Sequence, residues 1–371
     1  MKKLKILLLA DSSSIHTQRW ANSLSESGVE IAIFSLCESV GHYHQEIEIY
    51  TNGFDSKWTN RNNNIFSKII YLKTIRNLRK VIKEFKPDIL HAHFATSYGL
   101  LGALSRFKPF IISVWGSDIF EFPRRTLINN IVLRFNLLFP KCILSTSHIM
   151  AIETSKYTKK KILVTPFGVD ISKFMQKSNY NKNSTIVFGT IKTLDPVYGI
   201  DTLIKAFNIS HNKLLSKNIN SELHIIGGGP EELKLKKLAE DLNINNQIFF
   251  KGKIPHEEVP QQLQNFDIFV ALSNSESYGV AIVEASSCSL PVIVSNVGGL
   301  PEVVVNNETG FIIEPSNPEE AAAKMFELGI DKEKRETFGK QGRHFVEENY
   351  NWETNVKQMI EIYNNSIING Y

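Results

Sequence analysis

Phe266-Asp-Ile-Phe-Val-Ala-Leu272 is an apolar run, and Glu276-Ser-Tyr-Gly-Val-Ala-Ile-Val-Glu284 follows it after a short polar stretch. This order is typical of a buried strand that leads through a tight turn into a helix. Gly279 lies in the turn, where the missing side chain lets a ligand approach the backbone closely. We expect a helix from about Val280, with free N–H groups and a partial positive charge at its N-terminus. The stretch therefore predicts a phosphate site above the end of a strand.

Two carboxylates frame this turn. Glu276 precedes the expected helix, and Glu284 lies a little over one turn into it. The spacing suits a nucleotide sugar, with sugar hydroxyls at Glu276, the diphosphate at the backbone N–H groups of Tyr278, Gly279 and Val280, and the ribose at Glu284. The alternative is a solvated loop glutamate followed by a glutamate on a helix face, and the pair alone leaves both open.

Short apolar segments alternate with helical segments along the chain. We expect strands at Ile6–Ala10, Val29–Ser35, Ile89–His93, Phe110–Val114, Cys142–Ser145, Ile162–Thr165, Ile186–Gly189, Glu222–Ile226, Ile248–Lys251, Ile268–Leu272 and Pro291–Val294. Parallel strands that are buried on both faces have such continuous apolar runs. The alternation predicts an α/β protein with two doubly wound parallel sheets, and a ligand cleft at the carboxyl ends of the strands.

The totals favour two domains and exclude some classes of function. The chain has 371 residues and a net charge of +4, which is too small to argue for nucleic-acid binding. Cys37, Cys142 and Cys288 lack metal-ligand spacing, so we expect buried thiols in a reducing compartment. The apolar run near the N-terminus is short and ends at Asp11, which indicates a first buried strand rather than a signal peptide. With no stretch near the ~20 apolar residues of a membrane span, we expect a cytoplasmic protein.

Glycine-bearing loops follow several of the expected strands. They are Gly189-Thr-Ile-Lys-Thr-Leu-Asp-Pro-Val-Tyr-Gly199, Ile226-Gly-Gly-Gly-Pro-Glu231, Phe250-Lys-Gly-Lys-Ile-Pro255 and Gly298-Gly-Leu-Pro-Glu302. Each loop alone is compatible with a plain tight turn. Together they lie at one edge of one expected sheet, which indicates a ligand site.

With these loops and the two glutamates, the chain resembles the retaining glycosyltransferases of the large family 4, which have the GT-B fold. The resemblance covers nearly the whole chain and is densest from Thr185 to Pro315. It implies two Rossmann-like domains, with residues 1–175 binding the acceptor and residues 176–350 binding the nucleotide sugar. It also implies that a helix in residues 351–371 crosses back to the first domain. The implied reaction moves a sugar from a nucleoside diphosphate sugar with retention at the anomeric carbon.

The chain departs from this family at the phosphate side of the site. Relatives normally have an Arg, and a Lys six residues later, where this chain has Lys192 and Tyr198. Lys192 keeps the charge but not the bidentate fork of Arg, and we expect it to bind phosphate and act in catalysis together with Glu276. For Tyr198, a contact with phosphate or sugar and packing against the neighbouring helix both stay open.

The resemblance implies further features of the donor site. The backbone around Gly252 to Ile254 is expected to frame the base, and a UDP-sugar is favoured over a GDP-sugar. No Asp-x-Asp pair occurs in the sequence, which agrees with a metal-independent enzyme that needs no cofactor besides its sugar nucleotide. Retention without an obvious nucleophile fits attack on the same face, in which the leaving phosphate helps to deprotonate the acceptor.

Candidate acceptor residues lie in the first domain. His16 and Arg19 follow Ser12–Ser14, which can cap a helix, and either an acceptor contact or helix packing is open for them. Trp115 stands where many relatives have a His and is either an apolar platform for a sugar or core, and Asp118 belongs to the same segment. His91 and His93 alternate along a strand end, and we expect a satisfied core histidine there.

Two segments of the first domain combine basic and apolar residues. Residues 71–86 carry several Lys and Arg at helical spacing with apolar residues, and Arg124-Arg125 leads into the apolar stretch from Leu127 to Phe139. Such surfaces suit an anionic membrane, although a core helix with a solvated basic side is the alternative. The hypothesis is peripheral association with the inner face of a membrane, where a lipid-linked saccharide is the acceptor.

The leading interpretation is a hexosyltransferase-type enzyme of cell-surface polysaccharide or lipid-linked glycan biosynthesis. A non-catalytic partner protein with the GT-B fold is one alternative, motivated by Lys192 and Tyr198. A nucleotide-sugar epimerase on the same fold is another. Retention of Glu276 and Glu284 counts against the partner protein, and the Tyr-Gly turn between them favours transfer over epimerisation.

Overall fold

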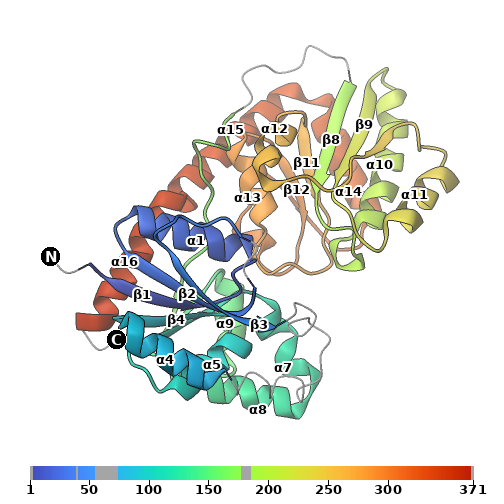
Figure 1. Ribbon diagram of the computed structural model, residues 1–371. Coiled ribbons are helices and arrows are strands. Elements are labelled where there is room, and N and C mark those ends of the chain that lie inside the picture. Colours follow the sequence, from blue (N-terminus) through green and yellow to red (C-terminus); the bar gives the residue numbers. More distant parts are fainter. Residues whose placement is uncertain (1–2, 39–40, 55–73, 177–184, 369–371) are drawn as a thin grey trace. The chain divides into compact units, whose positions relative to one another are not determined.

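The computed structural model describes residues 3–38, 41–54, 74–176 and 185–368 (Figure 1). The chain divides into two compact units, Met1–Pro166 with Thr354–Tyr371, and Phe167–Glu353. The sequence analysis placed a boundary after residue 175, whereas the division falls after residue 166. The backbone explains this difference, because the Val169 N–H donates to Tyr350 O at 2.8 Å and the Trp352 N–H donates to Val169 O at 3.0 Å.

The first unit contains a parallel sheet in the order β3-β2-β1-β4-β5-β6-β7. Its strands are β1 (Lys5–Leu9), β2 (Glu30–Cys37), β3 (Glu48–Phe54), β4 (Ile89–His93), β5 (Phe110–Val114), β6 (Cys142–Ser145) and β7 (Ile162–Val164). All of the pairs are parallel. The doubly wound sheet predicted for this part of the chain is therefore confirmed.

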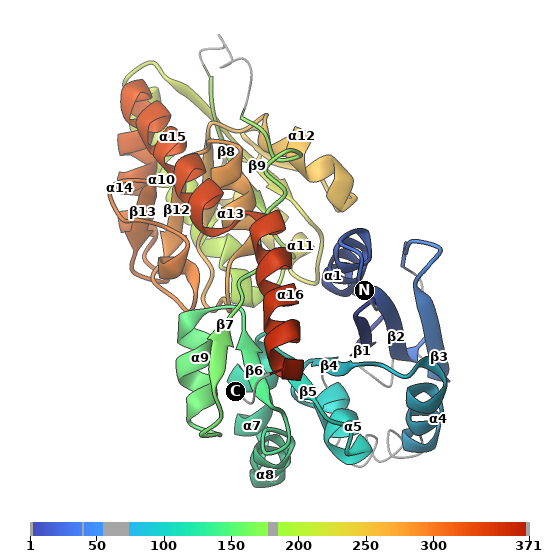
Figure 2. The same ribbon diagram turned by 90° about the vertical axis from the view of Figure 1, so that its left-hand side faces the viewer.

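Helices cover both faces of this sheet. They are α1 (Ile15–Glu26), α4 (Ile75–Phe85), α5 (Ser97–Ser105), α6 (Ser117–Phe120), α7 (Phe122–Arg125), α8 (Leu127–Asn136), α9 (His148–Ser155) and α16 (Trp352–Ile368). Leu7 and Leu9 pack into one core with Leu78 of α4 and Leu101 of α5. Helices α1 and α16 lie across the opposite face (Figures 1 and 2). The helix expected within residues 351–371 is α16.

The second unit repeats this design with the order β10-β9-β8-β11-β12-β13. Its strands are β8 (Thr185–Ile191), β9 (Asn220–Ile226), β10 (Ile248–Phe250), β11 (Ile268–Ala271), β12 (Val292–Ser295) and β13 (Gly310–Ile313), and all pairs are parallel. Its helices are α10 (Ile200–Leu215), α11 (Glu232–Asp241), α12 (Val259–Leu263), α13 (Val280–Ser287), α14 (Pro318–Ile330) and α15 (Lys332–Asn349). Three short 3-10 helices complete it, namely η2 (Pro196–Tyr198), η3 (His256–Glu258) and η4 (Leu300–Glu302).

Each sheet has one point where the strand order reverses, between β1 and β4 in the first unit and between β8 and β11 in the second. Loops that leave such neighbouring strands diverge, and ligands of open α/β sheets bind in the crevice that results. The loop after β8 carries Lys192, and the loop after β11 carries Glu276. The topology thus brings the two residues predicted to be catalytic to one switch point.

Two further findings bear on the sequence analysis. The three cysteines are buried, as expected. Among the helices that the structure describes, none is long and apolar enough to cross a membrane.

Candidate active site

Lys192 and Glu276 form an ion pair at the switch point of the second unit. Their side chains are only 11% and 13% exposed. The sequence placed these residues 84 positions apart, and the parallel neighbours β8 and β11 bring them together. The structure therefore joins the two residues predicted to be catalytic, while their roles stay predictions.

The ring of Tyr198 contacts the side chain of Lys192. The Lys192 Nζ lies 4.9 Å from the centroid of the Tyr198 ring, which is a cation–π geometry. The ammonium group is thus held by the Glu276 carboxylate and by the aromatic ring. We infer that the Tyr198 ring positions the Lys192 ammonium.

Glycines allow the backbone of these loops to approach closely. A Cβ on Gly227, which has φ +139°, would lie 1.8 Å from Lys192 O. A Cβ on Gly298, which has φ +51°, would lie 1.7 Å from Glu276 O. The Gly299 N–H also donates to Glu276 O at 3.1 Å. These glycine-bearing loops, which the sequence suggested as ligand loops, fix the backbone under Lys192 and Glu276.

Helix α13 begins at Val280, as the sequence predicted, and Gly279 precedes it with φ +102°. The Tyr278 side chain is buried, and its hydroxyl donates to Phe167 O at 2.5 Å. Tyr278 therefore anchors the Phe167 segment to its own unit. The Tyr278–Val280 backbone remains the segment at which a diphosphate is expected.

Glu284 on α13 is buried and bonded to a residue that the sequence analysis did not single out. The His256 Nε2 lies 2.8 Å from Glu284 Oε1, and the His256 side chain is 39% exposed. The His256 ring also faces Phe174, with centroids 6.0 Å apart. Its position could have indicated a role, because His256 directly follows the loop in which Gly252 and Ile254 were expected to frame the base.

The Gly252 to Ile254 loop leaves strand β10 at the same edge of the sheet. Gly252 has φ +70°, and its carbonyl accepts a hydrogen bond from the Gly227 N–H at 2.8 Å. Ile254 is partly exposed. This bond joins the Gly227 loop to the loop that leads to His256.

In the first unit, Asp118 bonds to backbone N–H groups rather than to another charged side chain. The buried Asp118 carboxylate accepts hydrogen bonds from the N–H groups of Ala95 at 2.8 Å, Gly116 at 2.9 Å and Trp115 at 3.2 Å. Burial raises the pKa of Asp118, and these hydrogen bonds oppose that rise. Asp118, expected on the acceptor side, thus ties together the loops that follow β4 and β5.

Aromatic rings gather near the end of β4. Trp115 lies 4.5 Å from the His93 ring and 6.0 Å from the His16 ring, measured between centroids. Thr17 Oγ1 lies 3.5 Å from His93 Nδ1. Arg19 is partly buried one turn along α1 from His16. The structure therefore places His16 beside Trp115.

His91 is the satisfied core histidine that the sequence predicted. Its Nδ1 lies 2.7 Å from Tyr363 Oη and its Nε2 lies 2.8 Å from Ser113 Oγ. Burial lowers the pKa of His91 to about 3. Burial also lowers the pKa of His93 well below its ordinary value.

Two further observations concern the start of α1 and metal ligands. The side chain of Ser14 precedes α1 without making a capping bond, and the Ser12 hydroxyl donates to Ser35 Oγ at 3.0 Å instead. Within the described ranges, no group of three or more His, Cys, Asp or Glu side chains is arranged to hold a metal ion.

Comparisons with known proteins agree with this arrangement. A family model described as "Glycosyl transferase 4-like" matches residues 5–147, and one described as "Glycosyl transferases group 1" matches residues 170–345. An uncharacterized glycosyltransferase of Methanocaldococcus jannaschii is 26% identical over 334 residues, covering 86% of this chain and 90% of that protein. The N-acetyl-alpha-D-glucosaminyl L-malate synthase of Bacillus anthracis is 25% identical over 333 residues, covering 85% of each chain.

A solved structure has the same fold. The Anabaena protein HepE, in complex with UDP and glucose, superposes with a TM-score of 0.77 at 17% identity, covering 97% of this chain and 99% of that one. Together with the two parallel-sheet units, this likeness confirms the GT-B fold.

Proposed function

The chain belongs to the group 1 glycosyl transferases, and on this premise we propose that it moves a sugar from a nucleoside diphosphate sugar to a saccharide or lipid-linked saccharide. We further propose that the reaction retains the anomeric configuration and needs no metal ion. The observation that carries the proposal is the Lys192–Glu276 ion pair at the β8–β11 switch point.

This pair can exchange partners when a donor binds. The diphosphate brings an anion to the Lys192 ammonium, and the Glu276 carboxylate then becomes free to accept hydrogen bonds from sugar hydroxyls. The ammonium stays paired throughout, which matters because an unpaired charge in a largely buried place is costly. Both side chains are largely buried, so each charged group needs a new partner when the pair separates, and the donor can supply one to each.

The residues of this chain stabilise the leaving group. As the bond between the anomeric carbon and the phosphate oxygen breaks, negative charge grows on the diphosphate. Lys192 and the N-terminus of α13 can both stabilise that charge. A new bond then forms between the acceptor oxygen and the anomeric carbon, and the acceptor proton passes to the departing phosphate oxygen on the same face of the sugar.

UDP-sugars are the first donors to test, since a protein of the same fold was solved with UDP and glucose. The product belongs to cell-surface glycan biosynthesis in this proposal. The acceptor is either a free saccharide or one that a membrane lipid carries.

The test measures transfer or donor hydrolysis with a panel of UDP- and GDP-sugars, followed by NMR of the anomeric centre of the product. We expect Lys192→Ala and Glu276→Ala each to lower kcat by about 100-fold to 1,000-fold. Lys205→Ala is the matched control, because Lys205 is a paired lysine on α10 outside the glycine-bearing loops. Wild-type activity in both site variants would remove the assigned site.

The same panel separates the alternative functions. Binding of nucleotide without turnover of any donor would favour the non-catalytic partner protein. Formation of a new sugar nucleotide without any acceptor would favour the epimerase. An inverted anomeric centre would overturn retention alone.

A further inference from the structure

Helix α8 in the first unit carries apolar side chains on its outward face in addition to Leu133, which is buried in the core. Its outward residues Leu127, Ile131 and Phe135, continued by Leu138, follow the i, i+4, i+8, i+11 spacing of one helix face. Leu127 is 85% exposed, Ile131 66% and Leu138 63%. A helix on the surface of a globular protein normally shows the reverse pattern, with its apolar stripe turned to the core. The outward face therefore suits an apolar environment.

The inward face of α8 is anchored by two amides. Asn129 Nδ2 donates to Phe122 O at 3.0 Å, and Asn136 Nδ2 donates to Ala95 O at 2.8 Å and to Thr96 O at 3.0 Å. Both residues are buried, beside Leu133. These bonds fix the rotation of α8 about its axis, so the apolar stripe is held outward.

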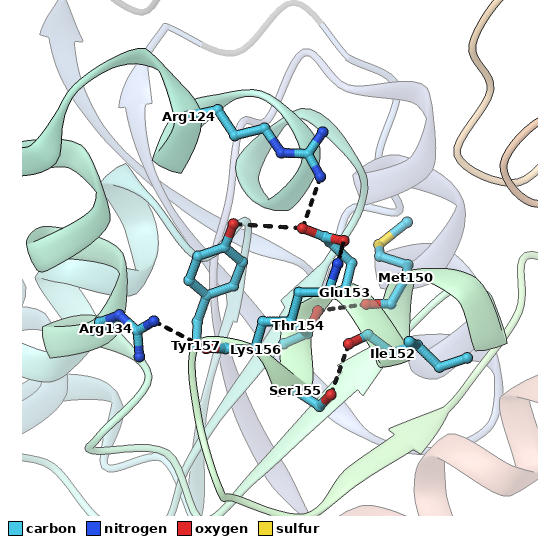
Figure 3. A network of polar contacts seen from close by, with 9 residues as sticks. All are labelled: Arg124, Arg134, Met150, Ile152, Glu153, Thr154, Ser155, Lys156 and Tyr157. Carbon is cyan, nitrogen blue, oxygen red and sulfur yellow. Dashed lines mark hydrogen bonds and ion pairs between the residues drawn. The ribbon is translucent and has the colours of Figure 1, made fainter.

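Arg124, Arg134 and Lys156 lie on the side of α8 that faces α9 (Figure 3). The Arg124 guanidinium donates to Glu153 Oε1 at 2.8 Å, and Lys156 Nζ donates to Glu153 Oε2 at 2.6 Å, while both cations remain about 60% exposed. Arg134 bonds to Asn130 Oδ1 at 2.8 Å and to Lys156 O at 3.0 Å. Because one carboxylate, Glu153, is shared by two of these three cations, this rim on the α9 side of α8 is positively charged.

The apolar surface continues beyond α8. Phe139, just past the end of α8, packs against Phe135 with ring centroids 5.0 Å apart, and it lines a hollow of about 310 Å³. The hollow also contains Arg106 and Lys108. The apolar stripe of α8 thus continues to Phe139, beside a hollow that contains two further cations.

We propose that this α8 surface, made of Leu127, Ile131, Phe135, Leu138 and Phe139 with the rim of Arg124, Arg134 and Lys156, docks on an anionic lipid bilayer. The helix lies in the plane of the interface, with its apolar stripe among the acyl chains and its cations at the headgroups. The match of charge selects a lipid surface over an apolar protein partner. This proposal rests on the proposed function and deepens it, because docking on a membrane favours a lipid-linked saccharide as the acceptor.

The sequence analysis suggested two basic segments for membrane contact, and they differ in the structure. Of residues 71–86, Tyr71, Leu72 and Lys73 lie outside the described residues, whereas Leu78, Val81 and Phe85 of α4 are buried. The apolar side of α4 therefore serves the core. The surface of α8 carries the proposal.

The test is co-sedimentation of the full chain with vesicles, without any donor, so that its failure is distinguishable from failure of the transfer assay. We expect binding to vesicles of phosphatidylcholine mixed with phosphatidylglycerol, weaker binding to phosphatidylcholine alone, and loss of the difference at high salt. The double variant Leu127→Ser/Ile131→Ser should lower the partition coefficient about 100-fold, roughly tenfold for each side chain.

Leu233→Ser on α11 is the matched control, because Leu233 is 83% exposed but lies in the second unit. It should bind vesicles like the wild type. Absence of binding to the anionic vesicles at low salt would overturn the proposal, as would equal loss in the control and the double variant.

A labelling experiment excludes other occupants of the surface. In Leu127→Cys, we expect rapid alkylation of the new thiol without vesicles and protection by anionic vesicles, whereas Leu233→Cys should react at the same rate in both conditions. Slow labelling of Leu127→Cys without vesicles would show that another part of the chain or a second copy covers the stripe. A mass that rises with protein concentration would then identify the second copy, and either outcome would overturn membrane docking.

Discussion

The two units have the same kind of sheet, but side chains in or just after their strands are bonded in different ways. In the second unit, Lys192 and Glu276 bond to each other. In the first unit, Asp118 bonds to three backbone N–H groups, and His91 bonds to Ser113 and Tyr363. A side-chain pair can separate when a ligand offers new partners, whereas a carboxylate bonded to the backbone holds loops together. The difference indicates which strand ends serve a ligand and which serve the fold.

The largest expected effect comes from removing the Asp118 carboxylate, which stabilises the fold of the first unit. Asp118→Ala leaves the N–H groups of Ala95, Trp115 and Gly116 without their acceptor, and we expect a loss of about 3 kcal/mol in the free energy of unfolding of the first unit. Hydrogen exchange of peptides from β4 and β5 measures that loss separately from the second unit.

Asp118→Asn is the conservative control, because it keeps one oxygen acceptor and should lose less stability. Donor affinity should be unchanged in both variants, since the residues proposed to bind the donor lie in the second unit. A fall in donor affinity without any change in hydrogen exchange would show that Asp118 serves a ligand after all.

An intermediate effect concerns the Glu284–His256 pair. Glu284→Gln removes the charge that is expected to accept ribose hydroxyls, and we expect UDP to bind about tenfold more weakly. His256→Ala should weaken UDP about threefold, because the imidazole that holds the carboxylate is lost. Calorimetric titration with UDP measures both. Tighter binding by His256→Ala would mean that the imidazole competes with the ribose for Glu284.

The smallest effect concerns the ring of Tyr198. Tyr198→Phe keeps a ring beside Lys192 and should keep wild-type transfer, while Tyr198→Ala should lower it about threefold, in line with roughly 0.5–1 kcal/mol for a cation–π contact. Initial rates at saturating donor give both values. A large loss in Tyr198→Phe would instead assign the hydroxyl a contact with phosphate or sugar.

Most strands were readable from the sequence because they are buried on both faces. Strands β4, β5 and β6 have the predicted bounds. Strands β3 and β13 were missed, and both are edge strands. The β3 sequence Glu-Ile-Tyr-Thr-Asn-Gly-Phe has no apolar run, whereas the apolar sequence Gly-Phe-Ile-Ile of β13 was simply overlooked.

The site was predictable only in part. The helix that begins at Val280 and the glycine-bearing loops could be predicted, because turns and helix termini depend on residues that are close together in the sequence. The Lys192–Glu276 bond, the Glu284–His256 bond and the boundary after residue 166 depend on contacts between distant segments. The exposure of the apolar stripe of α8 was also not readable, because the sequence shows apolar spacing but not which residues turn inward.

The bond between His91 and Tyr363 has a consequence for the order in which the chain matures on the ribosome. The first unit contains Met1–Pro166 but also Thr354–Tyr371, and the buried Met359 and Tyr363 of α16 complete one face of its sheet. Phe167–Glu353 is contiguous, whereas the first unit needs a segment that follows the whole of the second unit in the sequence. The unit that is translated first therefore cannot be completed until the last helix has been translated, and until then the part of its sheet that α16 covers is open to chaperones.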